Sequence, residues 1–485
     1  MASPEGGDGG SAVEPRVKIL NKETVLPASP TTRRGPFFLS CLDIMWQNMS
    51  YSRGLLFYQR PRGLSSLGSE QIIDGLGDDS ACDEHTSRSV NRLKRGLSVC
   101  LAQYFCWCGR LEKARDPPHR LYINLNEAEP DHRGEHLFSS PLLAIQATVF
   151  ADGGIAIGIA NSHVVADGLS LWQFMVSWGQ CTQGIPLSVP PLHDRRAVTV
   201  VNPSAEEASQ WKLRRGIDEE GEIDSEQETD TEMEGKSDPA TESSLHDPHH
   251  SDISSSQEQR LHDTKAQGDL VQYVFRMSAS TIQKLKGEAG GSYTSLEVLR
   301  AHFWQRISVA RRANADEWTY AIISVDHRPR INPPLAPSYF GNVLSSSIAV
   351  IKADKVRNRP LHFTVSRIHR QLAADKGKSI NRFMHWLETH DSCVRLSSSF
   401  LKYKGVTVGN SQWFPVYEVD FGWGKPVAAR VPKVGRDGVL LLLGGRPGSN
   451  QGDIEICTAF GSDVLERLLQ DPAFEAEPPC PIPLA

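Results

Sequence analysis

Apolar positions in the first part of the chain recur at helical and strand spacing. Leucine and aromatic residues three to four positions apart predict a helix over 87–106. Two short apolar runs, 144–150 and 155–161, flank a glycine-containing turn at 151–154 and predict a β-hairpin. A second helix is expected over 169–178. The second hairpin strand therefore leads directly into the loop that precedes this helix.

The second part of the chain mixes the same two periodicities. The sequence Thr294-Ser295-Leu296-Glu297 has the spacing of a helix capping box and is followed by apolar residues on one helical face. Short strands are expected at 320–325, 343–351 and 439–443, and another at 17–20 near the N-terminus. Because strands and helices are mixed in both parts, the fold class is predicted to be α/β.

An acidic window separates the two parts. Residues 218–258 contain 15 acidic residues, a single basic one and no aromatic residue. Such a segment buries too little apolar surface to offset the entropy of ordering, so we expect it to be disordered. The predicted organisation is a flexible tail at 1–35, a first domain at 36–202, an insertion at 203–268 and a second domain at 269–485.

The net charge of the chain outside this window has the opposite sign. The whole chain carries −6, but the acidic window carries −14, which leaves +8 on the rest. A basic folded part suits an anionic ligand. It has no basic run interleaved with aromatic residues, so a nucleic-acid partner is not expected.

The apolar runs and the cysteines bear on the cellular location of the protein. The apolar runs reach only five residues, as in Val439–Leu443, whereas a membrane span needs about 20, so none is expected. The first fifteen residues lack the apolar segment of a secretion signal, and the nine cysteines are an odd number, which favours a cytoplasmic location. Cys106 and Cys108 have no second pair at zinc spacing, so we interpret them as core residues and expect no metal site.

The segment from His163 to Gly168 carries the strongest candidate chemistry. His163 follows an apolar strand, where an imidazole partly shielded from water can act as a general base. Asp167, four residues later, can fix the turn or the ring by hydrogen bonding. The alternative interpretation, a structural histidine and a loop-capping aspartate, stays open on these residues alone.

Two further segments have unusual composition. Asp420-Phe421-Gly422-Trp423-Gly424-Lys425-Pro426 places two glycines around a tryptophan, which favours a tight structural turn over a functional role. The segment 326–330 places arginines beside a proline, where they would bind a buried carboxylate or a phosphate, or lie in solvent.

Several common catalytic motifs are absent from the sequence. We find no G-x-S-x-G, no P-loop, no G-x-G-x-x-G and no H-E-x-x-H. This argues against serine hydrolases, nucleotide hydrolases, dehydrogenases and zinc proteases. A lone histidine base without a paired nucleophile suits direct transfer between two bound substrates.

Taken together, these motifs resemble the plant BAHD acyl-CoA-dependent acyltransferases. The pairing of H-x-x-x-D-G at 163–168 with DFGWGKP at 420–426 is specific to that family. The resemblance extends over almost the whole chain; its other matching segments are 22–25, 39–46, 57–58, 109–111, 146–150, 325–330 and 339–342.

The resemblance implies a fold and a reaction. It implies two similar chloramphenicol-acetyltransferase-like domains, the first carrying HXXXD and the second DFGWG, with a solvent channel between them and His163 at its centre. Acyl-CoA enters from one face and a small-molecule acceptor from the other, as in enzymes of plant specialised metabolism. CoA is a co-substrate, no other cofactor is implied, and we expect a monomer. The acidic insertion falls at the family's crossover between domains.

The resemblance also implies roles for individual residues. His163 is the general base, and Asp167 points away from the channel to pair with Arg328 or Arg330. Asp420, Gly422, Trp423 and Gly424 are structural. The remaining assignments are CoA contacts for Lys284, Ser292, Thr294 and Ser295, and channel positions near the reacting carbonyl, including the oxyanion donor, for Ser411 and Trp413.

Within the family, the segment Tyr339-Phe340-Gly341-Asn342-Val343 resembles the hydroxycinnamoyl branch. The expected reaction is hydroxycinnamoyl transfer to a hydroxyl or amine, without a metal or a covalent intermediate. Two alternatives remain. A carrier-protein condensation domain shares H-x-x-x-D-G but usually has a second histidine where Ser162 stands, and a non-catalytic relative could act as a partner of lipid enzymes.

Overall fold

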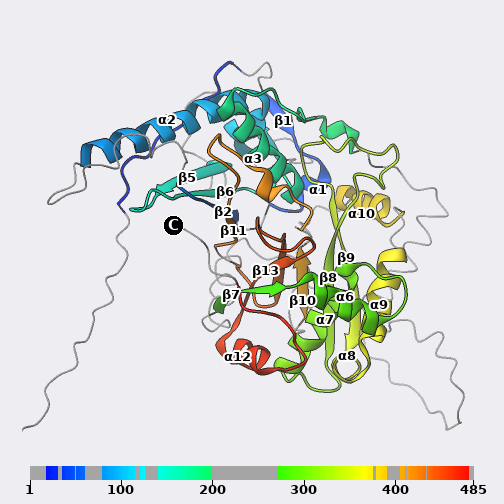
Figure 1. Cartoon of the computed structure of the whole chain (residues 1–485). Helices are drawn as coiled ribbons and strands as arrows, with labels where there is room; N and C mark the ends of the chain where they lie inside the picture. The colour runs from blue at the N-terminus through cyan, green and yellow to red at the C-terminus, as the bar shows by residue number, and fades with distance from the viewer. Residues whose placement is uncertain are drawn as a thin grey trace, which may run out of the picture.

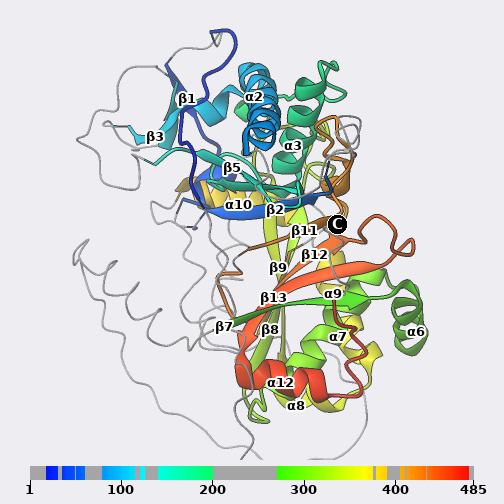
Figure 2. The same cartoon turned by 60° about the vertical axis from the view of Figure 1, so that its left-hand side comes forward.

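The computed structural model describes the chain in segments. These are 18–30, 35–47, 49, 51–60, 79–114, 121–125, 140–198, 200, 270–374, 378–389, 405–409, 412–432 and 434–479. The acidic insertion, the first part of the N-terminal tail and Ser411 lie outside these residues. The described chain forms two lobes, stacked one on the other in Figures 1 and 2.

The first lobe is built on a four-stranded antiparallel sheet with the order β11-β2-β6-β5. Its strands are β2 (Ser52–Tyr58), β5 (Leu143–Val149), β6 (Ile155–Asn161) and β11 (Ala428–Arg430). A smaller sheet contains β1 (Pro36–Phe38), β3 (Arg110–Lys113) and β4 (Leu121–Asn124). The helices of this lobe are α1 (Cys41–Ile44), α2 (Asp79–Gln103) and α3 (Gly168–Gln183), with 3₁₀ turns at Phe105–Cys108 and Arg195–Ala197.

The second lobe contains a six-stranded sheet with the order β7-β13-β12-β10-β8-β9. Only β10 has parallel neighbours on both sides. The strands are β7 (Leu270–Met277), β8 (Trp318–Asp326), β9 (Leu344–Lys352), β10 (Val406–Gly409), β12 (Val439–Gly444) and β13 (Ile454–Gly461). The helices are α6 (Ala279–Ala289), α7 (Ser295–Ala310), α8 (Ala353–Asn358), α9 (Leu361–Ala374) and α12 (Ser462–Gln470).

Elements from the second half of the sequence also belong to the first lobe. Strand β11 pairs with β2 through Ala428–Phe57, helix α10 (Lys378–Thr389) packs against α1, and a short 3₁₀ turn at Val416–Glu418 packs against α3 and β11. The boundary at residues 203–268 therefore divides the sequence into two halves, but parts of the C-terminal half pack in the first lobe.

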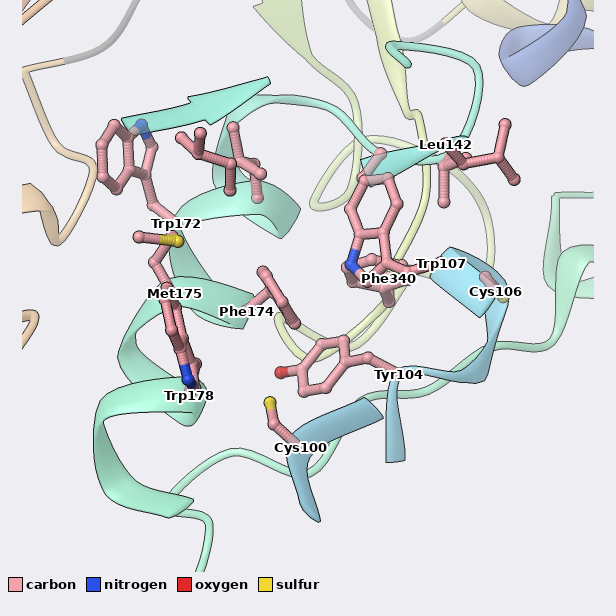
Figure 3. Close-up of a cluster of buried hydrophobic side chains, with 14 of the residues drawn as sticks. Cys100, Tyr104, Cys106, Trp107, Leu142, Trp172, Phe174, Met175, Trp178 and Phe340 are labelled. Carbon is pink, nitrogen blue, oxygen red and sulfur yellow. The ribbon is translucent and has the colours of Figure 1, made fainter. Parts of the chain in front are cut away.

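The core of the first lobe lies between α2, α3 and the sheet. Figure 3 shows its aromatic centre, where Tyr104, Trp107, Phe174 and Phe340 meet edge to face. Phe340 comes from the second half of the sequence and is 1 % exposed. Aromatic packing therefore ties the segment after β8 to the helices of the first lobe.

Most of the elements expected from periodicity are present, and the α/β class is confirmed. The hairpin is β5 and β6, the two helices are α2 and α3, and the Thr294–Glu297 capping box opens α7. Two expectations are wrong. Residues 18–20 form no strand; they run as exposed chain and pair with no strand of the described residues. Cys108 is exposed, whereas Cys106 is buried as expected, because the 3₁₀ turn directs the two thiols to different sides.

Part of the N-terminal segment docks on α2 rather than running free. Ser98 Oγ donates a hydrogen bond to the carbonyl of Leu26 at 2.6 Å, and Ala28 N donates to Ser98 O at 2.8 Å. Lys94 forms an ion pair with Glu23. These contacts fix residues 23–28 along the outer face of the helix.

Helices α2 and α3 are in close contact at Gly96. A Cβ atom at this position would lie 2.6 Å from Cα of Thr182, which is backbone and cannot move aside. Trp178 Nε1 donates to Leu93 O at 3.0 Å and Tyr104 Oη lies 2.9 Å from Ser177 Oγ, so polar contacts secure the helix pair on both sides of the glycine.

We expect Gly96→Ala to lower the free energy of unfolding by about 1–3 kcal/mol, because the methyl group overpacks the helix contact. Gly287→Ala in α6 is the matched control, since a Cβ there meets nothing within 4 Å. The control should leave stability unchanged or slightly raised. Urea unfolding of both variants provides the measurement, and equal effects would contradict the close approach.

Candidate active site

His163 lies in a short loop between β6 and α3. The strand ends at Asn161, and Asp167 is the N-cap of α3, where its Oδ1 accepts a hydrogen bond from Ser170 N at 3.0 Å. The loop is anchored at its start as well, because Ser162 N donates to Leu142 O at 2.9 Å. The five residues between strand and helix cap therefore have little freedom.

Asp167 forms a buried ion pair with Arg328. Arg328 Nη2 lies 2.8 Å from Asp167 Oδ2, and the two side chains are 3 % and 1 % exposed. Val343 N donates to the same carboxylate at 3.3 Å, and Ser170 Oγ accepts from Arg328 at 3.0 Å. Arg328 follows β8 in the second lobe, so this pair joins the lobes. Of the two arginines that the sequence allowed, Arg328 is the partner, whereas Arg330 donates to the backbone of Asp326.

The pKa of Arg328 reflects this environment. Burial opposes its charge, but Asp167 and Asp326 reverse the effect and raise the pKa above its usual value. The arginine is therefore charged at every physiological pH. The segment 326–330 supplies a cation for a buried carboxylate, as one of the interpretations of the sequence expects.

A second buried ion pair lies on the other side of the loop. Arg195 Nε is 2.8 Å from Asp43 Oδ2, and both side chains are buried. Asp43 Oδ1 also accepts hydrogen bonds from the backbone N–H and the side-chain amide of Asn342, at 3.0 and 2.9 Å. The Asn342 amide donates to His163 O at 2.9 Å, and Arg195 Nη2 donates to Val165 O at 2.9 Å. Both ends of this network hold the histidine loop by its carbonyls.

Sequence analysis missed Asp43, Arg195 and Asn342 as members of the site. Only the spacing of Ser40 and Asp43 carried a local signal, because it forms the capping box of α1. Nothing in the sequence alone pairs Asp43 with Arg195, which lies about 150 residues away. The pairing depends on how the two segments meet in space.

Trp46 covers the ring of His163. The ring centroids are 4.3 Å apart with an interplanar angle of 31°. Among the described residues, neither Nε1 of Trp46 nor Nδ1 of His163 has a hydrogen-bond partner, and both atoms are buried. The indole thus shields one face of the imidazole from water and supplies no hydrogen bond to it.

Burial lowers the pKa of His163 below its usual value of 6.5. Asp167, the backbone of His163 itself, Asn342 and Asp43 oppose this shift, but they are weaker than the loss of solvation. The imidazole is therefore neutral near pH 7. A neutral, shielded imidazole can accept a proton from a bound hydroxyl or amine.

The DFGWG segment is a turn organised by Asp420. Its Oδ1 accepts hydrogen bonds from Gly422 N at 2.7 Å and Gly424 N at 3.0 Å. Both glycines have positive φ, 96° and 106°, a conformation that other residues rarely adopt. Trp423 packs edge-on against Tyr58 at 6.1 Å. These contacts define a tight turn, and the structural role expected for these residues stays a prediction.

The four residues expected to contact CoA lie around the junction of α6 and α7. Lys284 pairs with Glu475 at 2.7 Å, Thr294 is engaged in the capping box of α7, and Ser295 begins that helix. Ser292 is exposed in the intervening loop. The structure places the four on neighbouring elements and leaves their role a prediction.

The two positions expected near the reacting carbonyl are less informative. Ser411 lies outside the described residues, and Trp413 is 76 % exposed.

Within the described parts of the chain, no three His, Cys, Asp or Glu side chains cluster as metal ligands. Over the same residues, no helix combines the length and the apolar character that crossing a membrane would need.

Comparison with known proteins agrees with this geometry. The model of the transferase family matches residues 126–474. The chain is 27 % identical over 416 residues to hydroxycinnamoyl-CoA:piscidic acid hydroxycinnamoyltransferase of Actaea racemosa, covering 77 % of this chain and 85 % of the relative. It is 24 % identical over 495 residues to shikimate O-hydroxycinnamoyltransferase of Nicotiana tabacum, covering 94 % and 100 %.

A solved structure supports the fold. TRI101 of F. graminearum, in complex with coenzyme A and T-2 mycotoxin, superposes with a TM-score of 0.62 over 91 % of this chain and 99 % of that one, at 14 % identity. The two lobes thus share the fold of that structure. The chain belongs to the transferase family of BAHD enzymes, and it is an acyl-CoA-dependent O- or N-acyltransferase.

We expect Asp167→Asn to lower the free energy of unfolding by about 3–5 kcal/mol, because Arg328 would be left buried without its carboxylate. Asparagine still caps α3, so the change isolates the charge. The control is Asp326→Asn, whose carboxylate also binds Arg328 but is 37 % exposed. It should cost about 1 kcal/mol or less. Urea unfolding measures the free energy of unfolding of both variants. Similar decreases in the two would show that the buried pair contributes no more to stability than the partly exposed one.

Proposed function

We propose that this protein transfers a hydroxycinnamoyl group from its CoA thioester to a hydroxyl or amine of a small-molecule acceptor, with His163 as the general base. The observation that carries the proposal is the state of His163. Its imidazole is kept neutral by burial and covered by Trp46, and its backbone carbonyl accepts a hydrogen bond from Asn342. A base held in this way needs only two substrates placed beside it.

In the proposed reaction, His163 accepts the proton of the acceptor group as that group attacks the thioester carbonyl. A C–O or C–N bond forms, and the carbonyl becomes a tetrahedral oxyanion. The C–S bond then breaks, and the departing CoA thiolate takes the proton from His163. Because Nδ1 is buried, Nε2 is the nitrogen that we assign to this transfer.

The oxyanion and CoA contacts in this proposal follow from the family resemblance. Trp413 and Ser411 remain the candidates for the oxyanion donor, and the exposed indole of Trp413 would serve only when a bound substrate covers it. Lys284, Ser292, Thr294 and Ser295 remain the candidates for CoA. The basic character of the chain outside its acidic window suits the phosphates of CoA.

Two observations favour an aromatic acyl group over malonyl. Several relatives are named for hydroxycinnamoyl transfer. A malonyl carboxylate would need a cation near the base, and both arginines that contact the His163 loop in the described structure, Arg195 and Arg328, already pair with Asp43 and Asp167. The side chain of Val343 is fully buried with Leu42 and Tyr339, so it does not contact the acyl group directly.

The relatives do not favour the alternatives of a condensation domain or a non-catalytic partner of lipid enzymes. A direct assay separates these functions: release of free CoA from hydroxycinnamoyl-CoA in the presence of mixed alcohols and amines. Release that depends on the acceptor supports acyl transfer. Absence of release with every acyl-CoA would reject the enzyme proposal.

We expect p-coumaroyl- or caffeoyl-CoA to exceed malonyl- and acetyl-CoA by at least about tenfold in kcat/KM, because burial of an aromatic ring contributes about 25 cal/mol per Å². Competition kinetics against one productive acceptor measures this ratio, with benzoyl-CoA as the control for ring size. A preference for malonyl- or acetyl-CoA would overturn the donor assignment and leave acyl transfer in place.

We also expect kcat/KM to be flat from about pH 7 to 8 and to fall only on the acid side. The base works unprotonated, and its pKa lies below the usual 6.5, so protonation removes activity only as the pH falls through that lowered value. Initial rates at subsaturating acceptor give the profile. An acid limb centred at or above pH 6.5 would contradict a desolvated His163.

A further inference from the structure

The ring of His163 has no hydrogen bond at Nδ1 that would fix its orientation. This nitrogen is buried and has no hydrogen-bond partner among the described residues. The torsion that turns an imidazole about its Cβ–Cγ bond has broad minima, so the backbone alone does not set the plane of the ring. A general base must nevertheless present its lone pair to the acceptor within a narrow range of positions. Packing must therefore set the plane of the imidazole.

Trp46 supplies this packing contact. Its ring centroid lies 4.3 Å from that of His163, and the two ring planes are inclined by 31°. Aromatic rings at such a distance prefer particular relative orientations, so rotation of the imidazole against the indole is opposed. Trp46 Nε1 is itself buried and has no partner in the described structure. The indole therefore acts on the imidazole through its face and not through a hydrogen bond.

The backbones of the two residues are held in register by Asp43. Trp46 N donates a hydrogen bond to Asp43 O at 3.1 Å. The Asp43 carboxylate accepts from the Asn342 amide at 2.9 Å, and the same amide donates to His163 O at 2.9 Å. Asp43 is fully buried and is also paired with Arg195. The indole and the imidazole are thus attached to the same buried aspartate, which keeps one ring over the other.

We propose that Trp46 is a positioning residue for acyl transfer: its indole face sets the plane of the His163 imidazole so that Nε2 is directed at the acceptor. The inference rests on the proposed function, in which His163 is the general base. Trp46 acts through the histidine and is assigned no contact with either substrate. Because the contact is made by a ring face, position 46 needs a flat side chain, and an aliphatic one is not equivalent.

Two apolar replacements separate the flat ring from its bulk. We expect Trp46→Leu to lower kcat between about pH 7 and 8 by about 10- to 100-fold, since a base misplaced by about 1 Å loses activity on that scale. Trp46→Phe keeps a ring face and should stay within about threefold of the wild type. The KM values of both substrates should change by less than about threefold in either variant.

Trp318→Leu is the matched control. Trp318 is also partly buried, but its ring faces Lys352 at the start of β8 and not the histidine loop. This variant should leave kcat unchanged. A fall in kcat equal to that of Trp46→Leu would show that loss of any partly buried tryptophan lowers activity, and it would overturn the proposal.

The pH profile separates orientation from the exclusion of water. The charged groups around the ring are Asp167 with Arg328 and Asp43 with Arg195, and the variants leave all four in place. If Trp46 only excluded water, Trp46→Leu would move the acid limb toward the usual pKa of 6.5 and leave the plateau intact. The proposal expects the plateau itself to fall, wherever the acid limb lies. A Trp46→Leu plateau within about threefold of wild type overturns it.

A spectroscopic measurement tests the stack without an assay of activity. The full chain is labelled with carbon-13 at histidine Cε1, and the signal of His163 is the one missing from His163→Ala. In the wild type we expect its Cε1 proton upfield of those of exposed histidines, because the ring current of a stacked indole shields it. Trp46→Leu should abolish this shift, and Trp46→Phe should keep part of it. An unshifted signal in the folded wild type overturns the proposal, and this signal decides where Trp46→Leu fails to fold.

The same variants distinguish failure of this inference from failure of the proposed function. If His163→Ala keeps kcat within about tenfold of wild type, the assignment of the base is wrong and the positioning role is rejected with it. If His163→Ala loses activity while a folded Trp46→Leu retains it, only the positioning role is wrong. Loss in both, with rescue by Trp46→Phe, supports it.

Discussion

The ion pair between Asp167 and Arg328 is the interaction on which the site depends. It is fully buried and joins the histidine loop of the first lobe to the end of β8 in the second. A buried pair contributes little net stability, but loss of either partner leaves an uncompensated charge. The pair therefore specifies how the lobes meet, and His163 lies four residues from it at that junction.

A second pair, Asp43 with Arg195, gives the loop its other support. Asn342 links this pair to the carbonyl of His163, and Val343 links the following residue to Asp167. One short segment of the second half of the sequence thus contacts both carboxylates. The charged groups bind backbone groups of the loop, while burial keeps the imidazole uncharged and Trp46 covers it.

Local sequence patterns predicted the strands and helices that carry the site. They did not predict features that depend on contacts between residues far apart in sequence. The alternation of β5 and β6 and the position of His163 after them follow from nearest neighbours in sequence. Periodicity carries no information on β11, which joins a sheet whose other strands precede it by hundreds of residues. The Asp43–Arg195 pair is missed for the same reason, whereas Cys108 is misplaced because apolar composition does not reveal which way a 3₁₀ turn faces.

The central claim is that His163 is the general base of acyl transfer, and replacement of its imidazole tests it most directly. Turnover of His163→Ala and wild type is measured as CoA release at saturating hydroxycinnamoyl-CoA, together with the melting temperature of each. The claim predicts that kcat falls by roughly 10² to 10⁴ while the melting temperature stays close to that of the wild type. A kcat within about tenfold of wild type, in a folded variant, would contradict it.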